Sequence, residues 1–186
     1  MKSALFTLGT ILTTIWVSAQ DFKTVSWGMT MEQVIEAEEI KTYSKAPDSI
    51  NYKTEMAGLP AVLVYIFDEG ELVKAKYKFN LEYLDPNDYI RDYEMLKGRL
   101  VDKYGQPYDT EVSWQNDRYK EDRMKWGTAL NNGNVVFYDR WKGDFNKVDL
   151  GMLGDGSRVY LHIHYYDVEY ARIMEEKEAE KRTKDL

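Results

Sequence analysis

The chain contains no cysteine, and it has only two histidines and four prolines among its 186 residues. Without cysteine there are no disulfides, thiolate nucleophiles, cysteine-ligated metals or lipid-modified N-terminal cysteine. The glycines at 151, 154 and 156 are not followed by Lys-Ser/Thr, and no Gly-x-Ser-x-Gly elbow occurs. With 32 Asp and Glu residues, close acidic pairs are inevitable and none is singled out. The sequence thus offers no catalytic constellation and predicts no cofactor.

The one long apolar run lies at the start of the chain. Lys2 precedes an almost uncharged segment, Ala4 to Val17, and Val17 and Ala19 occupy the small-residue positions of a cleavage site. This pattern predicts a secretory signal peptide over residues 1–19, because the run is short for a membrane span and no stop-transfer segment follows. We therefore expect export to the periplasm, or alternatively secretion, with no membrane span after cleavage.

The remaining chain is acidic. Lys2 is the only charge in residues 1–19, so 25 less 1, or 24, Lys and Arg remain against 32 Asp and Glu, a net charge of about −8. Such a chain is poorly suited to nucleic acid or anionic lipid, because both would repel it. Aromatic residues are abundant, with 15 Tyr, which is typical either of a tyrosine-lined sheet rim or of a binding surface.

The first half after residue 19 predicts one helix and three strands. Thr30 and Gln33 form a capping-box pattern at the start of a helix of about ten residues. Alternating or apolar runs then predict strands at 50–56, 61–67 and 71–79. Asp68-Glu69-Gly70 suits a three-residue hairpin loop, with Gly70 left-handed.

The second half repeats this order. A helix is predicted after Asp85 and Pro86, because an apolar stripe runs from Tyr89 to Tyr104 and Gly105 and Pro107 then stop it. Strands are expected at 111–115, 134–141, 147–153 and 157–166, with a short helix somewhere within 118–130.

These elements predict an α+β fold, with an antiparallel sheet packed on one face by two amphipathic helices and a duplicated helix-plus-meander layout. We expect one domain over residues 20–166 and a charged C-terminal helix or tail over 167–186. The predicted core residues are Val34, Leu63, Tyr65, Phe67, Val73, Tyr77, Phe79, Ile90, Tyr93, Leu96, Leu100, Val136 or Phe137, Leu161 and Ile163.

Two short motifs carry a resemblance to known proteins. Trp27-Gly28-Met29-Thr30 opens the first helix, and Lys103-Tyr104-Gly105-Gln106-Pro107 closes the second. With these motifs the chain resembles a loose group of small exported bacterial proteins of unknown function. Its layout is similar to that of the outer-membrane assembly lipoprotein BamE and of the β-lactamase inhibitory protein. Both of those work by binding other proteins, so the resemblance implies a binding function.

Two polar rows are the candidate binding residues. Lys74, Lys76 and Lys78 alternate with apolar residues on one strand, and Tyr160, His162, His164 and Tyr166 do so on the last strand. Because the apolar rows of one sheet face a common core, the two polar rows are expected to share the opposite face. The lysine row is either a solvated face that discourages edge pairing or a positive patch for an acidic partner.

His162 and His164 also allow a metal site, if Asp139 or Asp167 completes the ligand shell. Neighbouring lysines would instead lower the pKa of both imidazoles and repel a cation. The sequence predicts an exported, non-catalytic module that binds another envelope protein through the exposed sheet face. A small-ligand or glycan binder using tyrosine and tryptophan, and a hydrolase, are the alternatives.

Overall fold

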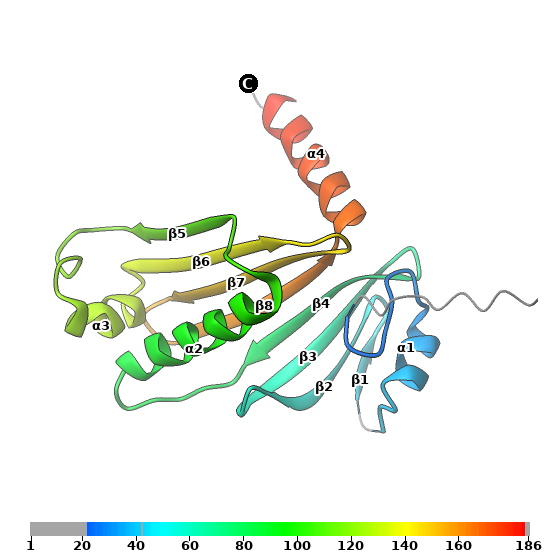
Figure 1. The fold of residues 1–186 in the computed structure, drawn as a ribbon, viewed down its shortest axis with the longest axis horizontal. Helices are drawn as coiled ribbons and strands as arrows, with labels where there is room; N and C mark the ends of the chain where they lie inside the picture. The colour runs from blue at the N-terminus through cyan, green and yellow to red at the C-terminus, as the bar shows by residue number, and fades with distance from the viewer. Residues whose placement is uncertain (1–21, 42, 185–186) are drawn as a thin grey trace, which may run out of the picture.

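The protein forms an eight-stranded antiparallel sheet with helices, seen in a computed structural model that describes residues 22–41 and 43–184 (Figure 1). The predicted signal peptide lies outside the described residues. The helices are α1 (Met31–Ala37), α2 (Asn87–Tyr104), α3 (Trp126–Asn131) and α4 (Val168–Lys184). The strands are β1 (Ser44–Ala46), β2 (Ser49–Met56), β3 (Leu59–Asp68), β4 (Glu71–Phe79), β5 (Asp109–Trp114), β6 (Val135–Lys142), β7 (Asn146–Gly154) and β8 (Val159–Asp167).

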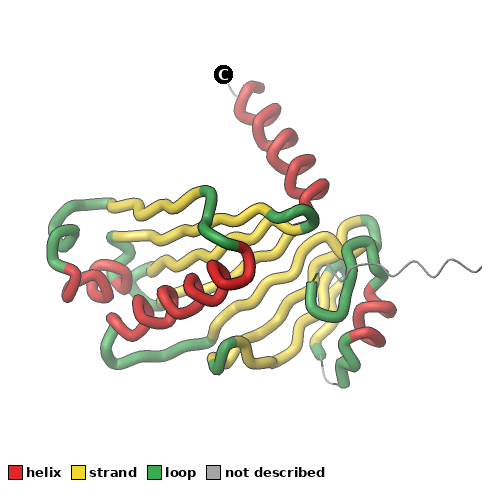
Figure 2. Tube along the Cα trace, viewed as in Figure 1, coloured by secondary structure: helices red, strands yellow, loops and turns green. Residues whose placement is uncertain are grey.

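The strand order confirms the α+β prediction and its duplicated layout. The order across the sheet is β1-β2-β3-β4-β8-β7-β6-β5, so each half is a helix followed by a four-stranded meander. The halves join where their last strands, β4 and β8, pair in antiparallel register. Figure 2 shows the strands of both halves forming one continuous twisted layer.

Helices α1, α2 and α3 lie on one side of this sheet (Figure 1). The core fills the space between them and contains fully buried side chains from both halves, such as Val34, Leu96 and Ile163. Every predicted core residue is buried except Val73 and Ile90, with Phe137 taking the position shared with Val136. On the opposite side, which we call the outer face, α4 is the one described helix in contact, and it reaches only the edge, where Glu175 pairs with Lys147.

The ends of α1 and α2 follow the predicted local chemistry. Thr30 and Gln33 make both hydrogen bonds of the capping box. Helix α1 has only 7 residues, shorter than predicted, because the chain leaves helical geometry at Glu39 with a φ of 50°. Before α2, Asp85 accepts a hydrogen bond from the Asn87 amide at 2.9 Å. Gly105 ends α2 with a φ of 79°, a value at which glycine avoids the strain that a Cβ brings.

Three details of the predicted elements are wrong. The β3–β4 loop has two residues, Glu69 and Gly70, because Asp68 pairs with Glu71. The register then shifts between Ile66 and Phe67, so Leu72 enters the core in place of Val73. On α2, Tyr89 is buried and Ile90 only partly so. The bulge breaks the strict alternation of side chains along β4. Helix α2 turns a slightly different side toward the core than its apolar stripe predicts.

The ambiguous segment at 118–130 is helical only in its last part. A 3-10 turn at Arg123–Lys125 leads directly into α3. Gly127 allows α3 to meet the start of α2, since a Cβ there would lie 2.4 Å from backbone atoms of Pro86 and Asn87. The helical segment is short because only Gly127, Ala129 and Leu130 are buried against the fold.

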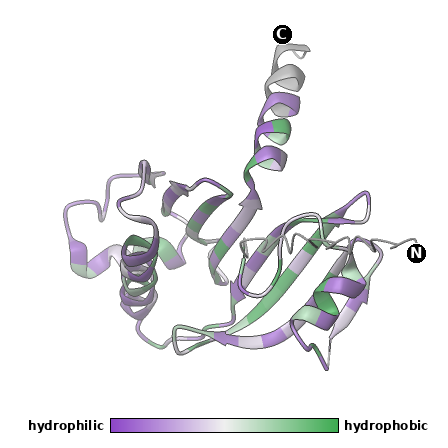
Figure 3. Ribbon diagram, turned by 45° about the vertical axis from the view of Figure 1, so that its right-hand side comes forward, coloured by the Kyte–Doolittle hydropathy of each residue, from purple (hydrophilic) through white to green (hydrophobic). Residues whose placement is uncertain are grey.

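Helix α4 projects away from the sheet (Figure 1). Its first turns contact β7 and β8, Ala171 is buried, and the Lys147 ammonium on β7 lies 2.6 Å from the Glu175 carboxylate. In Figure 3 the coloured part of the α4 ribbon is mainly hydrophilic, with a few hydrophobic residues near its start. The predicted charged C-terminal helix is therefore present, and its start is fixed to the sheet.

Candidate binding face

The outer face brings the two predicted polar rows into direct contact. Strands β4 and β8 are neighbours, with Lys74 opposite Tyr166, Lys76 opposite His164 and Lys78 opposite His162. The sequence predicted one shared face but did not reveal that the strands pair. Tyr160 lies at the end of the same row of β8, where it is 45% exposed and donates a hydrogen bond to Asp155.

Aromatic rings form a row across this face. The His162 and His164 rings stack with their centroids 4.5 Å apart, and the Tyr166 ring lies 5.8 Å from His164. On the other side the Tyr138 ring of β6 lies 6.2 Å from His162. We call Tyr138, His162, His164 and Tyr166 the ring row. It crosses the centre of the sheet, where the two halves meet.

Gly151 of β7 lies between Tyr138 and His162 in the register of the sheet. A Cβ at this position would come within 2.5 Å of ring atoms of both residues. Glycine costs stability inside a strand, because the unfolded chain loses more freedom there. Because Gly151 has no side chain, the rings of Tyr138 and His162 can both lie directly above β7.

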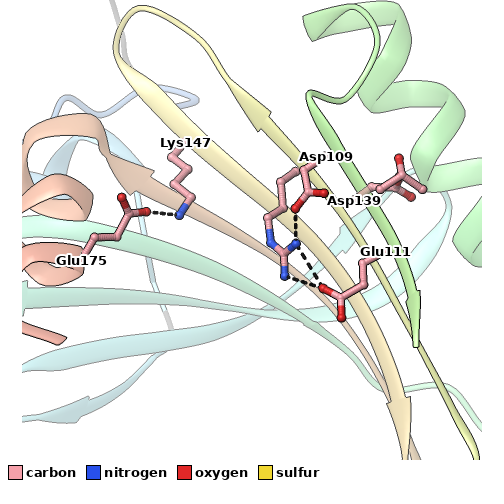
Figure 4. Close-up of polar contacts among 7 residues, drawn as sticks. Asp109, Glu111, Asp139, Lys147 and Glu175 are labelled. Carbon is pink, nitrogen blue, oxygen red and sulfur yellow. Dashed lines mark hydrogen bonds and ion pairs between the residues drawn. The ribbon is translucent and has the colours of Figure 1, made fainter. Parts of the chain in front are cut away.

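Cationic side chains border the ring row. The Lys74 ammonium lies 4.6 Å from the Tyr166 ring centroid, and the Arg140 guanidinium lies 5.3 Å from that of Tyr138. Both distances fall within the range of cation–π attraction. Arg140 also forms ion pairs with Asp109 and Glu111 of β5 (Figure 4). The charge of Arg140 is therefore compensated within the protein.

The lysines of β4 differ from Arg140 in this respect. Among the described residues, Lys74, Lys76 and Lys78 form no ion pair. Burial, followed by repulsion from the next lysine in the row, lowers the pKa of Lys74 and of Lys76. The row thus holds positive charge that is partly withdrawn from water and forms no ion pair with a carboxylate of the described residues.

The two histidines are uncharged at neutral pH. Burial lowers the pKa of His162 to about 4 and that of His164 to about 2, with Lys74 and Lys76 adding repulsion. The direction agrees with the sequence-based expectation, but burial, rather than the lysines, is the larger cause. His164 Nδ1 lies 2.8 Å from the Tyr166 hydroxyl oxygen, while its buried Nε2 has no hydrogen-bond partner.

Asp149 of β7 is the carboxylate nearest this centre in the sheet register, opposite His164. Its Oδ1 is buried without a hydrogen-bond partner, and burial raises its pKa despite the opposing effect of Lys147, Arg140 and Lys74. One acidic side chain therefore lies among the three cations named. It offsets only part of their charge.

Neither Asp139 nor Asp167 is placed to complete a metal site with His162 and His164. Asp139 points to the helix side of the sheet, away from the histidines, where it accepts hydrogen bonds from Tyr93 at 2.7 Å and Thr110 at 2.5 Å and pairs with Lys97 at 2.8 Å (Figure 4 shows Asp139). Asp167 caps the start of α4 through the Tyr170 amide. The described part of the chain contains no group of three His, Cys, Asp or Glu side chains placed to hold a metal ion.

Sequence reasoning missed five residues of this face, which are Tyr138, Arg140, Lys147, Asp149 and Gly151. The alternation along β6 and β7 already places them opposite the apolar residues of their strands. Their relation to the histidines depends on the pairing of β8 with β7, and no local pattern encodes that pairing.

Comparison with known proteins leaves the site to be interpreted from its own geometry. No family model, curated protein or solved structure matches the chain. Within residues 22–41 and 43–184, no helix has the length and apolar character required to cross a membrane.

Proposed function

We propose that this protein is an exported, non-catalytic binding module that engages another protein of the cell envelope through its outer face. The observation that carries the proposal is the pairing of the lysine row with His162, His164 and Tyr166 on the outer face, whose centre none of the described helices covers. Export is proposed from the signal-peptide pattern of residues 1–19.

The charge of the face supports an acidic protein as partner. The whole chain carries a net charge of −7, yet Lys74, Lys76 and Lys78 gather on one strand and form no ion pair with a carboxylate of the described residues. Complementary charge steers association and fixes the register of a complex. Aromatic rings beside such cations add contact area at little cost in conformational entropy.

The same groups are poorly suited to acid–base catalysis. A general base works best when its pKa lies near the working pH. The pKa values of about 4 for His162 and about 2 for His164 leave both imidazoles weakly basic at neutral pH. This supports a binding role over a hydrolase.

Site-specific photocrosslinking in the native envelope tests the proposal. A photoreactive amino acid replaces either Lys78 or Tyr160 on the outer face, or Arg99 or Asp102 on the exposed side of α2 as matched controls. We expect one discrete protein adduct from the outer-face positions and none from α2. In addition, Lys76→Glu should abolish the adduct formed from position 160, because it reverses the charge at the centre of the row.

Equal adducts from both sets of positions, or none from the outer face, would contradict this function.

The ring row also favours a second candidate, a glycan binder, since sugar rings stack on aromatic side chains. Glycan-array binding that depends on Tyr138 and Tyr166, together with no protein adduct, would establish that alternative.

A further inference from the structure

The lysine row has the geometry of an extended chain. Lys74, Lys76 and Lys78 are alternate residues of β4, so their Cα atoms follow one another at about 6.7 Å on one side of the strand. On one flank they pair with Val62, Val64 and Ile66 of β3, and on the other with His162, His164 and Tyr166 of β8. The lysines therefore follow the direction of β4 between two less polar rows of the same sheet face.

The chemistry of the row favours carboxylates. Lys74 and Lys76 are only partly exposed, and among the described residues no acidic side chain forms an ion pair with the row. Asp149 attracts Lys74 without forming an ion pair with it. Asp149 lies beyond the ring row on β7, opposite His164. An ammonium group that has lost part of its hydration gains more from a new carboxylate than one in bulk water, because the local dielectric constant is lower.

The structure assigns this line a specific occupant. We propose that the outer face binds an extended segment of an acidic protein, in which Asp or Glu at every second position contacts Lys74, Lys76 and Lys78. This inference rests on the proposed function and specifies the partner's conformation and charge pattern.

Backbone periodicity explains why an extended segment fits and a helix does not. In a strand, side chains at alternate positions point to the same side with the spacing of the lysine row. In a helix, carboxylates four residues apart have a similar rise, but each is rotated by about 40° from the one before. The third carboxylate of a helix would therefore be rotated by about 80° from the first, whereas in a strand all three point to the same side.

Two synthetic peptides of identical composition and charge test the charge pattern. Both are capped and built from threonine with three glutamates, placed at every second position in one and at every third in the other. NMR titration of the full-length protein measures their affinities. We expect the alternating peptide to bind at least about tenfold more tightly, and the pKa of His162 to rise in its complex, because a nearby anion stabilises the imidazolium.

Charge reversal links this preference to the row. Lys78→Glu, at an exposed position, should remove the difference between the peptides, whereas Arg99→Glu on α2 changes the net charge equally and should retain it. Thermal unfolding of each variant verifies that it is folded, and Lys76→Gln provides a second, uncharged test.

Three results would overturn the inference: equal affinity for the two peptides, loss of the preference in Arg99→Glu, or displacement of the peptide by polyphosphate at equal charge concentration. The last would show that the face accepts any polyanion. Photocrosslinking uses no peptide and therefore tests the proposed function separately. If the outer face gives a specific adduct but any of these three results is found, only the inference of an extended acidic segment is refuted. Loss of the adduct itself would refute the proposed function.

Discussion

At the scale of single residues, the outer face is organised around side chains that are buried but not fully paired. His164 Nε2 and Asp149 Oδ1 have no hydrogen-bond partner, and their residues lie opposite each other in the sheet. Such groups cost stability even when they are uncharged, and they cost far more when they carry a charge. The shifts in their pKa values, down for His164 and up for Asp149, both favour the neutral forms.

The histidines should make the protein sensitive to moderate acid. The pKa of His162 is about 4 in the folded state against 6.5 without the protein environment, so the unfolded chain binds protons first as pH falls. The stabilisation is complete above pH 6.5 and is lost as pH falls to about 4, amounting to roughly 3 kcal/mol. Urea unfolding of the wild type and His162→Gln across this range should give a shallower pH dependence for the variant. Parallel curves would refute this account.

Two glycines should respond in opposite ways to the same substitution. Gly98 lies in α2 with open space around it, so Gly98→Ala should raise the free energy of unfolding by about 0.5–1 kcal/mol. At Gly151 a Cβ would meet the rings of Tyr138 and His162 within 2.5 Å. Gly151→Ala should therefore give no such gain and should shift the His162 ring resonances. Similar stabilisation by both variants would show that the rings do not need the space.

At the scale of elements, α2 holds the second half of the sheet through apolar and polar contacts together. Leu96 is fully buried, and Tyr93 and Lys97, which lie one turn apart on the same helix, both contact Asp139, which is itself buried on β6. The apolar side chains supply most of the burial. The buried carboxylate fixes where along β6 the helix lies, because its partners reach it in only one register.

Leu96→Ala should lower the free energy of unfolding by about 2–5 kcal/mol, because it removes a buried side chain and leaves a cavity. Arg99→Ala, on the exposed side of the same helix, is the control for helix propensity and should change stability by less than about 0.5 kcal/mol. Denaturant unfolding measures both values. A small loss for Leu96→Ala would place α2 away from the core.

At the scale of the whole molecule, the two meander halves are joined by more than the β4–β8 pairing. Phe22, before α1, packs against Tyr165 of β8 with ring centroids 4.6 Å apart. The Trp27 indole donates a hydrogen bond to Asn146 Oδ1 at 2.9 Å, at the start of β7. The segment that precedes the first half is thus anchored on the second.

We therefore expect both halves to unfold in one cooperative transition. Calorimetry should give equal calorimetric and van't Hoff enthalpies, and tryptophan fluorescence should follow the same curve as far-UV circular dichroism. Trp27→Phe should lower the transition temperature without dividing the transition. Two separate transitions in the wild type would show that the halves are independent domains.

Local patterns in the sequence determined most of the elements and the face on which most side chains lie. The alternation in β4 and β8 separated Lys76 and His164 from the core, and Thr30 and Gly105 marked helix ends. These features depend on residues close together in the chain, where steric and hydrogen-bonding preferences act directly. The bulge at Val73 of β4, opposite Ile66 and Phe67, was missed because it depends on how β3 and β4 pair.

Only the tertiary structure decided which rows meet. The pairing of β4 with β8 places the lysines beside the histidines, and that of β8 with β7 brings in Gly151 and Asp149. Strand order depends on burying apolar surface from residues that are far apart in sequence, so no short pattern encodes it. The same pairing buries the imidazoles, and this is why burial, rather than the neighbouring lysines, dominates the low pKa of both histidines.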